Sequence, residues 1–122
     1  MTLIAIRGAI TCDENSAEAI LSATHRLMSA IIEKNHLIPD HVISLIFSAT
    51  PDLDAAYPAQ AVRQMGWIQV PMLCLQEMKV ANSLPRCLRV LIHYEANPPF
   101  APCHVYLNAA QSLRPDWAQA SG

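Results

Sequence analysis

Residues 41–49 read HVISLIFSA, and this stretch decides the fold. Apolar side chains fill most of its positions instead of alternate ones, which is typical of a strand covered on both faces. We therefore expect a central strand here, in a sheet built from segments on both sides of it. The candidates for the other strands are residues 2–10, 68–75, 86–95 and 104–113.

Two helices are expected beside these strands. Asn15 followed by Glu18 has the pattern of a capping box, which predicts a helix from there to about Lys34. A short helix is expected over 58–65, because the proline at its start lacks a donor that the first turn does not need. The long helix has one apolar stripe at helical spacing, made of Ile20, Leu21, Leu27, Met28, Ile31 and Ile32.

These segments predict an α+β fold of α/β-like character. Its five-stranded sheet is mostly antiparallel or mixed, with one long and one short helix against one face. The 122 residues fit a single domain, expected to span 1–116, and the small polar residues of 117–122 predict a mobile tail. With 52% hydrophobic and only 15% charged residues, the chain favours an oligomer whose subunits cover the other face of the sheet.

Charge, hydropathy and spacing exclude several classes of protein. A net charge of −2 and an isoelectric point near 6.2 offer no basic stripe for nucleic acid. No apolar run reaches the roughly 18 residues of a membrane span, and the first residues lack a secretory signal pattern, so we expect a cytoplasmic protein. The four cysteines and five histidines lack zinc-site spacing, and no nucleotide-binding motif is present, so we expect no metal and no other cofactor.

Charged residues within apolar segments are the first indication of function. Arg7, Glu77 and Arg89 lie where burial of an unpaired charge costs on the order of several kcal/mol. The planar fork of arginine binds carboxylates through two hydrogen bonds, so Arg7 and Arg89 favour an anionic ligand. Pairing within the chain is the alternative, and for Arg63, on the short helix, the two interpretations are balanced. Glu77 could neutralise an arginine or accept a hydrogen bond from a substrate hydroxyl.

Two further residues remain open at this point. No histidine is placed by sequence to activate Cys74, which favours a packed thiol over a nucleophile. Tyr106 could belong to the core or donate a hydrogen bond to a carboxylate. If the chain is an enzyme, these residue types favour catalysis by electrostatics and positioning.

Several segments resemble those of the monofunctional, trimeric chorismate mutases with a pseudo-α/β-barrel core. They follow the family's order over almost the whole chain, and they read IRGAIT (6–11), FSATPDLDAAYPAQAVR (47–63), VPMLCLQEM (70–78), CLRV (87–90) and HVYLNAAQSLRPD (104–116). The resemblance implies rearrangement of chorismate to prephenate, on the route to phenylalanine and tyrosine, without a cofactor. It also implies a homotrimer with active sites at the subunit interfaces.

The same resemblance implies a role for five catalytic residues. Arg7 would bind a substrate carboxylate, and Arg89 would contact the ether oxygen and a carboxylate. Glu77 would accept from the ring hydroxyl, with Cys74 beside it, and Tyr106 would donate to the side-chain carboxylate.

The resemblance further implies a set of substrate-binding residues, some of them from the neighbouring subunit. They are Arg63, Tyr57, Ala59, Gln60, Met72, Leu73, Leu113 and Arg114. Tyr57 stands where phenylalanine is usual, and Gln60 replaces a lysine, which removes one cation near the substrate.

Two other functions are alternatives to this one. A trimeric module that binds a carboxylate metabolite or hydrolyses an imine would explain Arg89 and the trimer. A non-catalytic paralogue that binds chorismate as a regulator would fit Gln60. The first does not explain Glu77 and Tyr106 together with two further arginines, and Gln60 is the single feature that favours the second.

Overall fold

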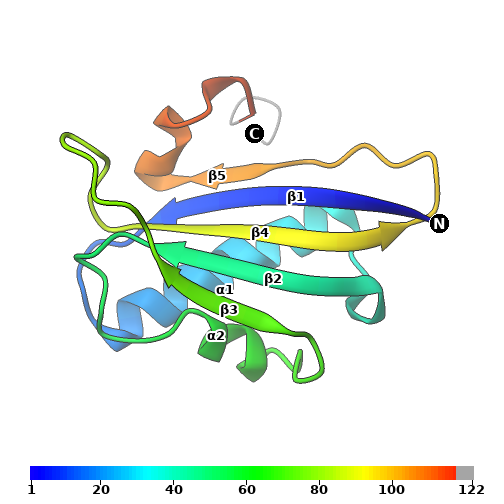
Figure 1. The fold of residues 1–122 in the computed structure, drawn as a ribbon, viewed down its shortest axis with the longest axis horizontal. Helices are drawn as coiled ribbons and strands as arrows, with labels where there is room; N and C mark the ends of the chain where they lie inside the picture. The colour runs from blue at the N-terminus through cyan, green and yellow to red at the C-terminus, as the bar shows by residue number, and fades with distance from the viewer. Residues whose placement is uncertain (118–122) are drawn as a thin grey trace.

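The computed structural model describes residues 1–117 of the chain. Its elements follow the order β1 (Thr2–Thr11), α1 (Ala17–Asn35), η1 (Pro39–His41), β2 (Val42–Ala49), α2 (Ala59–Gln64), β3 (Met72–Gln76), β4 (Cys87–Ala96), β5 (Val105–Leu107) and η2 (Asn108–Ser112), where η marks a short 3₁₀ helix. Figure 1 shows these elements along the chain. Within this part of the chain, the helices fall short of the length and apolar character that crossing a membrane requires.

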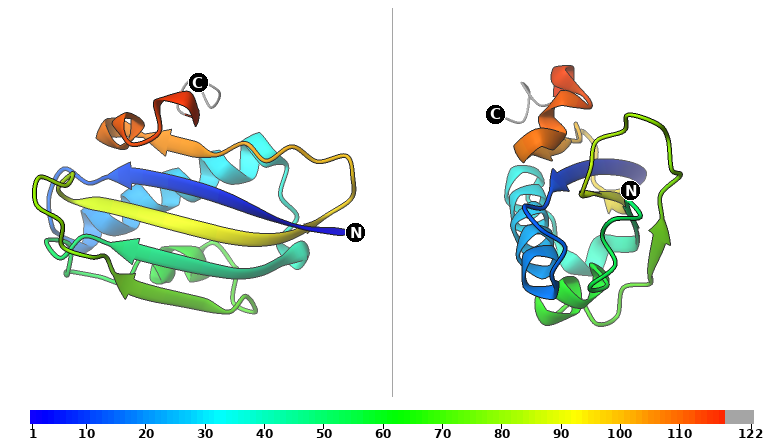
Figure 2. Two further views of the ribbon diagram at one scale, coloured as in Figure 1. Left: turned by 45° about the horizontal axis from the view of Figure 1, so that its top comes forward. Right: turned by 90° about the vertical axis from the view of Figure 1, so that its left-hand side faces the viewer.

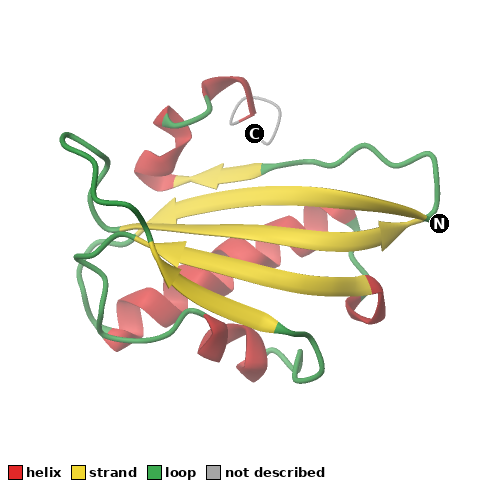
Figure 3. Ribbon diagram, in the orientation of Figure 1, coloured by secondary structure: helices red, strands yellow, loops and turns green. Residues whose placement is uncertain are grey.

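The strands form one mixed sheet in the order β3-β2-β4-β1-β5. In the described chain β4 pairs antiparallel with both β1 and β2, whereas β3 and β5 pair in parallel at the two edges. Figure 3 shows the five strands side by side, with the helices behind them. The prediction of a mixed five-stranded sheet with one long and one short helix is confirmed, and β2 is an interior strand between β3 and β4. In a single chain only one face of β2 is buried, and Ile43 is 43% exposed.

Both helices cover one face of the sheet, and we call the other face the open face. Figure 2 shows the two layers edge-on. The core between them contains Ile6, Ile10, Leu27, Ile31, Phe47, Leu88 and Ile92, all essentially inaccessible to solvent. Gly8 permits this close packing, because a Cβ atom there would lie 2.7 Å from a side-chain carbon of Ile31 on α1. The even-numbered residues of β1 therefore face α1, and the odd-numbered residues lie on the open face.

The predicted boundaries of most elements shift by a residue or more, and three of these shifts are informative. Ser16, not Asn15, caps α1, since its hydroxyl accepts from the Ala19 amide at 3.1 Å. β3 begins at Met72 because Pro71 has no N–H to donate, although its carbonyl accepts from Leu45. The predicted last strand, 104–113, ends at Leu107.

The early end of β5 has a local cause. Asn108 has a φ of 55°, a left-handed conformation that asparagine tolerates better than most residues. Its side chain donates to the Thr11 carbonyl at 3.0 Å, which anchors this bend to the end of β1. The chain then turns into η2 instead of continuing the strand.

Candidate active site

Strand alternation brings three of the predicted catalytic residues to the open face. On β1, Ala9 pairs with Arg89 of β4 and with Tyr106 of β5, so all three side chains point to the same side of the sheet. Arg7, two residues before Ala9, lies on that side too. The sheet therefore fixes Arg7, Arg89 and Tyr106 relative to one another through backbone hydrogen bonds.

Glu77 joins them from the end of β3. Its amide donates to the Ala49 carbonyl at 2.8 Å, which extends the pairing of β3 with β2 by one residue. Its Oε1 lies 2.6 Å from Arg89 Nε, an ion pair whose side chains are 19% and 30% exposed. The N–H of Nε is not aligned with this oxygen, so the contact is Coulombic more than a hydrogen bond. We call Arg7, Glu77, Arg89 and Tyr106 the open-face group.

Two oxygens of the open-face group are buried without a hydrogen-bond partner within residues 1–117. They are Glu77 Oε2 and the Tyr106 hydroxyl. Such atoms are rare in folded proteins, because each loses its hydration without replacement. Burial raises the pKa of Tyr106, against a smaller lowering by nearby arginines, so the hydroxyl remains a donor at neutral pH. One acceptor and one donor are thus held ready for a ligand.

A second small core supports this group from the C-terminal side. Ala9, Cys87, Tyr106 and Ala110 form a buried cluster on the open face. Partly buried residues pack around it, including Leu84, Leu113 and Trp117. Burial raises the pKa of the Cys87 thiol to about 11, so this cysteine is a packed apolar side chain and not a thiolate.

Trp117 is a member of the site that the sequence did not reveal. The Arg114 guanidinium carbon lies 3.5 Å from its ring centroid, and that of Arg7 lies 5.7 Å away. Its ring centroid is 6.0 Å from that of Tyr106. Residues 117–122 were predicted as a mobile tail; 118–122 lie outside the described residues, whereas Trp117 packs on the open-face group. A tryptophan in an otherwise small and polar segment was the available signal.

The sequence prediction also left His104 out of the site. There the histidines entered only through their lack of zinc-site spacing. His104 precedes β5, and its ring centroid lies 4.0 Å from that of Trp117. Its Nδ1 accepts from the main-chain amide of Arg7 at 3.0 Å. The pattern His104-Val105-Tyr106 could have indicated it, because alternate residues of a strand share a face.

Other predicted residues lie on the opposite side of the sheet. Tyr57, Gln60 and Cys74 line a cavity of about 560 Å³ between the start of α1, the loop after β2, and β3. Cys74 pairs with Phe47, a core residue, so it points to the helical face and away from Arg89. We call Tyr57, Gln60 and Cys74 the cavity group.

The remaining predicted residues lie near the open-face group or near the cavity group. Within a single chain they do not come together in one site. Leu113 packs against the open-face cluster, and Arg114 lies over Trp117 beside it. Ala59 is buried, and Met72 packs on the main core. Arg63 is exposed on α2, and Leu73 is 61% exposed on β3. One chain thus presents the open-face group and the cavity group on opposite faces of the sheet.

The open-face group can bind an anion that also carries a hydroxyl. Arginines attract carboxylates, Tyr106 offers a donor, and Glu77 offers an acceptor. Among residues 1–117, no group of three potential ligands could hold a metal ion. This set of residues favours charge stabilisation over nucleophilic attack.

Comparisons with known proteins agree with this chemistry. The family model for chorismate mutase type I matches residues 3–117. The chorismate mutase AroH of Bacillus subtilis (strain 168) is 44% identical over 118 residues, which cover 95% of this chain and 93% of that protein. The chorismate mutase AroH of Thermus thermophilus is 43% identical over 117 residues, or 94% of this chain and 96% of that protein.

A solved structure supports the same assignment. A chorismate mutase from Clostridium thermocellum superimposes with a TM-score of 0.86 at 44% identity, covering 89% of this chain and 98% of that one. The findings do not favour a carboxylate-binding or imine-hydrolysing module or a non-catalytic paralogue. The chain belongs to the chorismate mutase type I family.

Proposed function

We propose that this chorismate mutase, an isomerase of aromatic amino-acid biosynthesis, acts on chorismate through its open-face group. The observation that carries the proposal is the pair of buried, unpartnered oxygens of Glu77 and Tyr106 beside the Arg89 guanidinium. Chorismate has two carboxylates, a ring hydroxyl and an ether oxygen. Each of these groups finds a complementary partner in Arg7, Glu77, Arg89 or Tyr106.

The reaction requires positioning and charge stabilisation alone. One carbon–oxygen bond breaks while one carbon–carbon bond forms within the same molecule, and no proton moves. Bond breaking leads, so negative charge grows on the ether oxygen. Arg89, already held by Glu77, stabilises that charge more in the transition state than in the bound substrate, which is the requirement for raising kcat.

The other members of the group hold the substrate in its reactive conformation. Glu77 accepts from the ring hydroxyl, and its ion pair with Arg89 sets the orientation of the guanidinium. Arg7 and Tyr106 bind a carboxylate of the flexible enolpyruvyl arm. Fixing that arm over the ring removes rotational freedom before the reaction, a contribution that can reach several orders of magnitude in rate.

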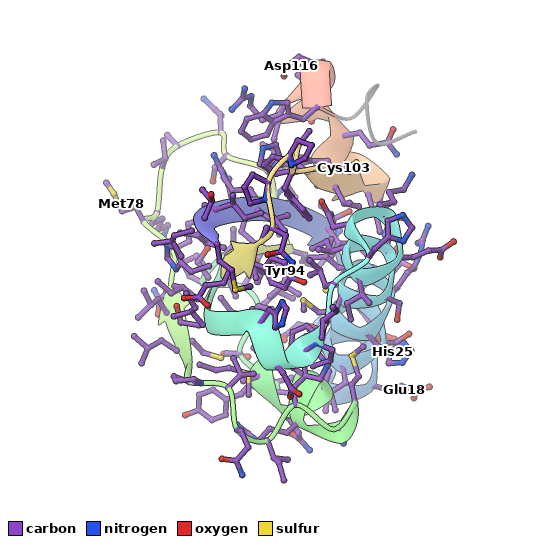
Figure 4. The ribbon with its side chains drawn as sticks, turned by 90° about the vertical axis from the view of Figure 1, so that its right-hand side faces the viewer. Glu18, His25, Met78, Tyr94, Cys103 and Asp116 are labelled. Atoms are coloured by element: carbon purple, nitrogen blue, oxygen red, sulfur yellow. The ribbon has the colours of Figure 1, made fainter. Side chains whose placement is uncertain are left out.

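We further propose a homotrimer in which the cavity group and Arg63 of one subunit complete the site of its neighbour. The separation of the two groups on opposite faces of one chain supports this arrangement. The open face exposes large apolar side chains, with Leu3 61%, Leu73 61% and Leu75 52% accessible. Figure 4 shows Met78, 81% exposed, at the outer end of the loop that follows β3. Several large apolar side chains exposed on one face are typical of a subunit interface.

The proposal includes a cytoplasmic location. All four cysteines, which lie within residues 1–117, are free thiols. Free thiols are typical of proteins in a reducing compartment.

Conversion of chorismate tests the function itself. The purified protein is mixed with chorismate, and loss of chorismate is followed together with formation of prephenate. The proposal expects chorismate to disappear and prephenate to form at equal rates. Binding without turnover would favour a regulatory paralogue, and absence of binding would favour the imine-hydrolysing module.

Cys74→Ser is expected to keep kcat within a few-fold of wild type. No thiolate attack occurs in a pericyclic reaction, so replacing the sulfur leaves the groups that stabilise charge, Arg89 and its ion-pair partner Glu77, in place. Steady-state kinetics, with circular dichroism to verify folding, provide the measurement. Complete loss of activity in a folded Cys74→Ser protein would restore the nucleophile hypothesis.

The kcat of the wild-type enzyme is expected to be nearly constant over roughly pH 6 to 8, because no group acts as a general acid or base. The raised pKa of Tyr106 keeps its hydroxyl protonated throughout this range. The measurement is kcat at saturating chorismate in buffers of constant ionic strength. A steep bell-shaped profile within this range would indicate proton transfer.

A further inference from the structure

We propose that His104 is a positioning residue for Arg7, whose main-chain amide its imidazole holds in place. The inference deepens the proposed function, since it rests on Arg7 binding a carboxylate of chorismate. It assigns to His104 no contact with the substrate. Its effect passes through the backbone of β1 to the Arg7 guanidinium.

The imidazole extends the pairing of β1 with β5 by one residue. The regular parallel register begins at Gly8 and Val105, one residue after Arg7 on β1. At Arg7, the acceptor is His104 Nδ1, 3.0 Å from the amide nitrogen. The ring nitrogen thus takes the place that a backbone carbonyl of β5 would otherwise fill. On its other side Arg7 lies opposite Leu91 of β4.

Only the neutral ring can make this contact. An Nδ1 that accepts from an N–H bears no proton, so the proton of the imidazole is on Nε2. The ionisable groups around the ring are Arg7 on β1, Tyr106 on β5, and Arg114 with its ion-pair partner Asp116 in the C-terminal segment. Burial, then Arg7 and Arg114, lower the pKa of His104 below its ordinary 6.5. The acceptor form therefore persists into mildly acidic solution.

The ring has a second attachment that can be separated from the first. Its face lies against Trp117, with centroids 4.0 Å apart and planes inclined by 34°. A phenylalanine at this position would keep the aromatic contact and lose the acceptor. An asparagine would lose the aromatic contact and keep an acceptor oxygen close to the place of Nδ1. The two variants distinguish holding of the Arg7 amide from packing under Trp117.

The experiment compares His104→Phe with His104→Asn in the full chain. Because a partly buried N–H would lose its acceptor, His104→Phe is expected to raise KM for chorismate about ten-fold, with a smaller change in kcat. His104→Asn should hold KM within about three-fold of wild type, since its amide oxygen restores the acceptor. The reverse order, with His104→Asn the more impaired, would overturn the proposal in favour of packing.

Nuclear magnetic resonance of the Arg7 amide provides a readout independent of turnover. Its hydrogen exchange should be slow in wild type and His104→Asn and faster in His104→Phe. In wild type, the Arg7 amide signal should shift as the pH falls through the lowered pKa of His104, and KM should rise over the same range. A KM that falls there would mean that the added positive charge outweighs the lost contact, which would overturn the proposal.

Two controls separate this inference from the proposed function. His25 is exposed on α1, and Figure 4 shows it well away from Cys103, the residue before His104, and from Asp116. His25→Asn should retain the wild-type acid dependence of KM. Arg7→Ala should raise KM more than His104→Phe does. An unchanged KM in Arg7→Ala would overturn the proposed role of Arg7 and with it the positioning role, whereas the amide exchange still reports whether His104 holds β1.

Discussion

Arg89→Lys is expected to lower kcat by at least about 100-fold, because one preorganised donor at a developing oxyanion typically contributes that much. The Arg89 Nε lies 2.6 Å from Glu77 Oε1, and this ion pair keeps the guanidinium on the open face. Lysine keeps the positive charge but not the planar fork, so it cannot satisfy Glu77 and the ether oxygen together. The measurement is kcat at saturating chorismate.

The fold should survive this substitution, since the Arg89 side chain is 30% exposed and lies outside the main core. Arg26→Lys is the matched control. Arg26 is exposed on α1 and donates to Asn108, outside the open-face group, so its replacement should leave kcat near wild type. A kcat of Arg89→Lys within a few-fold of wild type would remove Arg89 from the centre of the mechanism.

Arg63→Ala is expected to reduce kcat/KM by about 10- to 100-fold, the loss typical of one charge-assisted hydrogen bond to a carboxylate. In a single chain Arg63 is exposed on α2, on the side of the sheet away from Arg89. In a monomeric enzyme, this substitution would therefore leave kcat/KM unchanged. A large loss of activity with an unchanged melting temperature is expected only if α2 contributes to the site of a neighbouring subunit.

Gln64→Ala serves as the control for Arg63→Ala. Gln64 follows Arg63 on α2 and is also exposed, but the proposal gives it no contact with chorismate. It should keep kcat/KM within about two-fold, as most surface substitutions away from special features do. Equal effects of the two variants would point to a general disturbance of α2.

The fold followed from the sequence wherever burial imposed a pattern. The apolar run of β2 and the helical stripe of α1 identified both elements, because one face of β2 and one stripe of α1 are buried in the core. The errors fall where single residues override the pattern. Pro71 delays β3 because it lacks a donor, and Asn108 ends β5 by adopting a left-handed conformation.

Only part of the candidate site could be predicted from the sequence. Arg7, Glu77 and Arg89 stood out because a charge in an apolar segment needs a partner. The family resemblance placed Cys74 beside Glu77, yet three residues along a strand put the two side chains of one chain on opposite faces. The contact of His104 with Arg7 spans 97 residues, and no local pattern encodes it.

The central claim is that each active site combines the open-face group of one subunit with Arg63 of another, and mixed trimers test it most directly. Arg89→Lys and Arg63→Ala chains are co-expressed with different tags, and assemblies carrying both tags are isolated. In a closed three-fold ring, a trimer with two chains of one kind and one of the other contains a single site with both residues intact. The account predicts about one third of wild-type kcat/KM for the mixed trimers, although each variant alone retains about a tenth or less. Activity no greater than that of the two parent variants would contradict it.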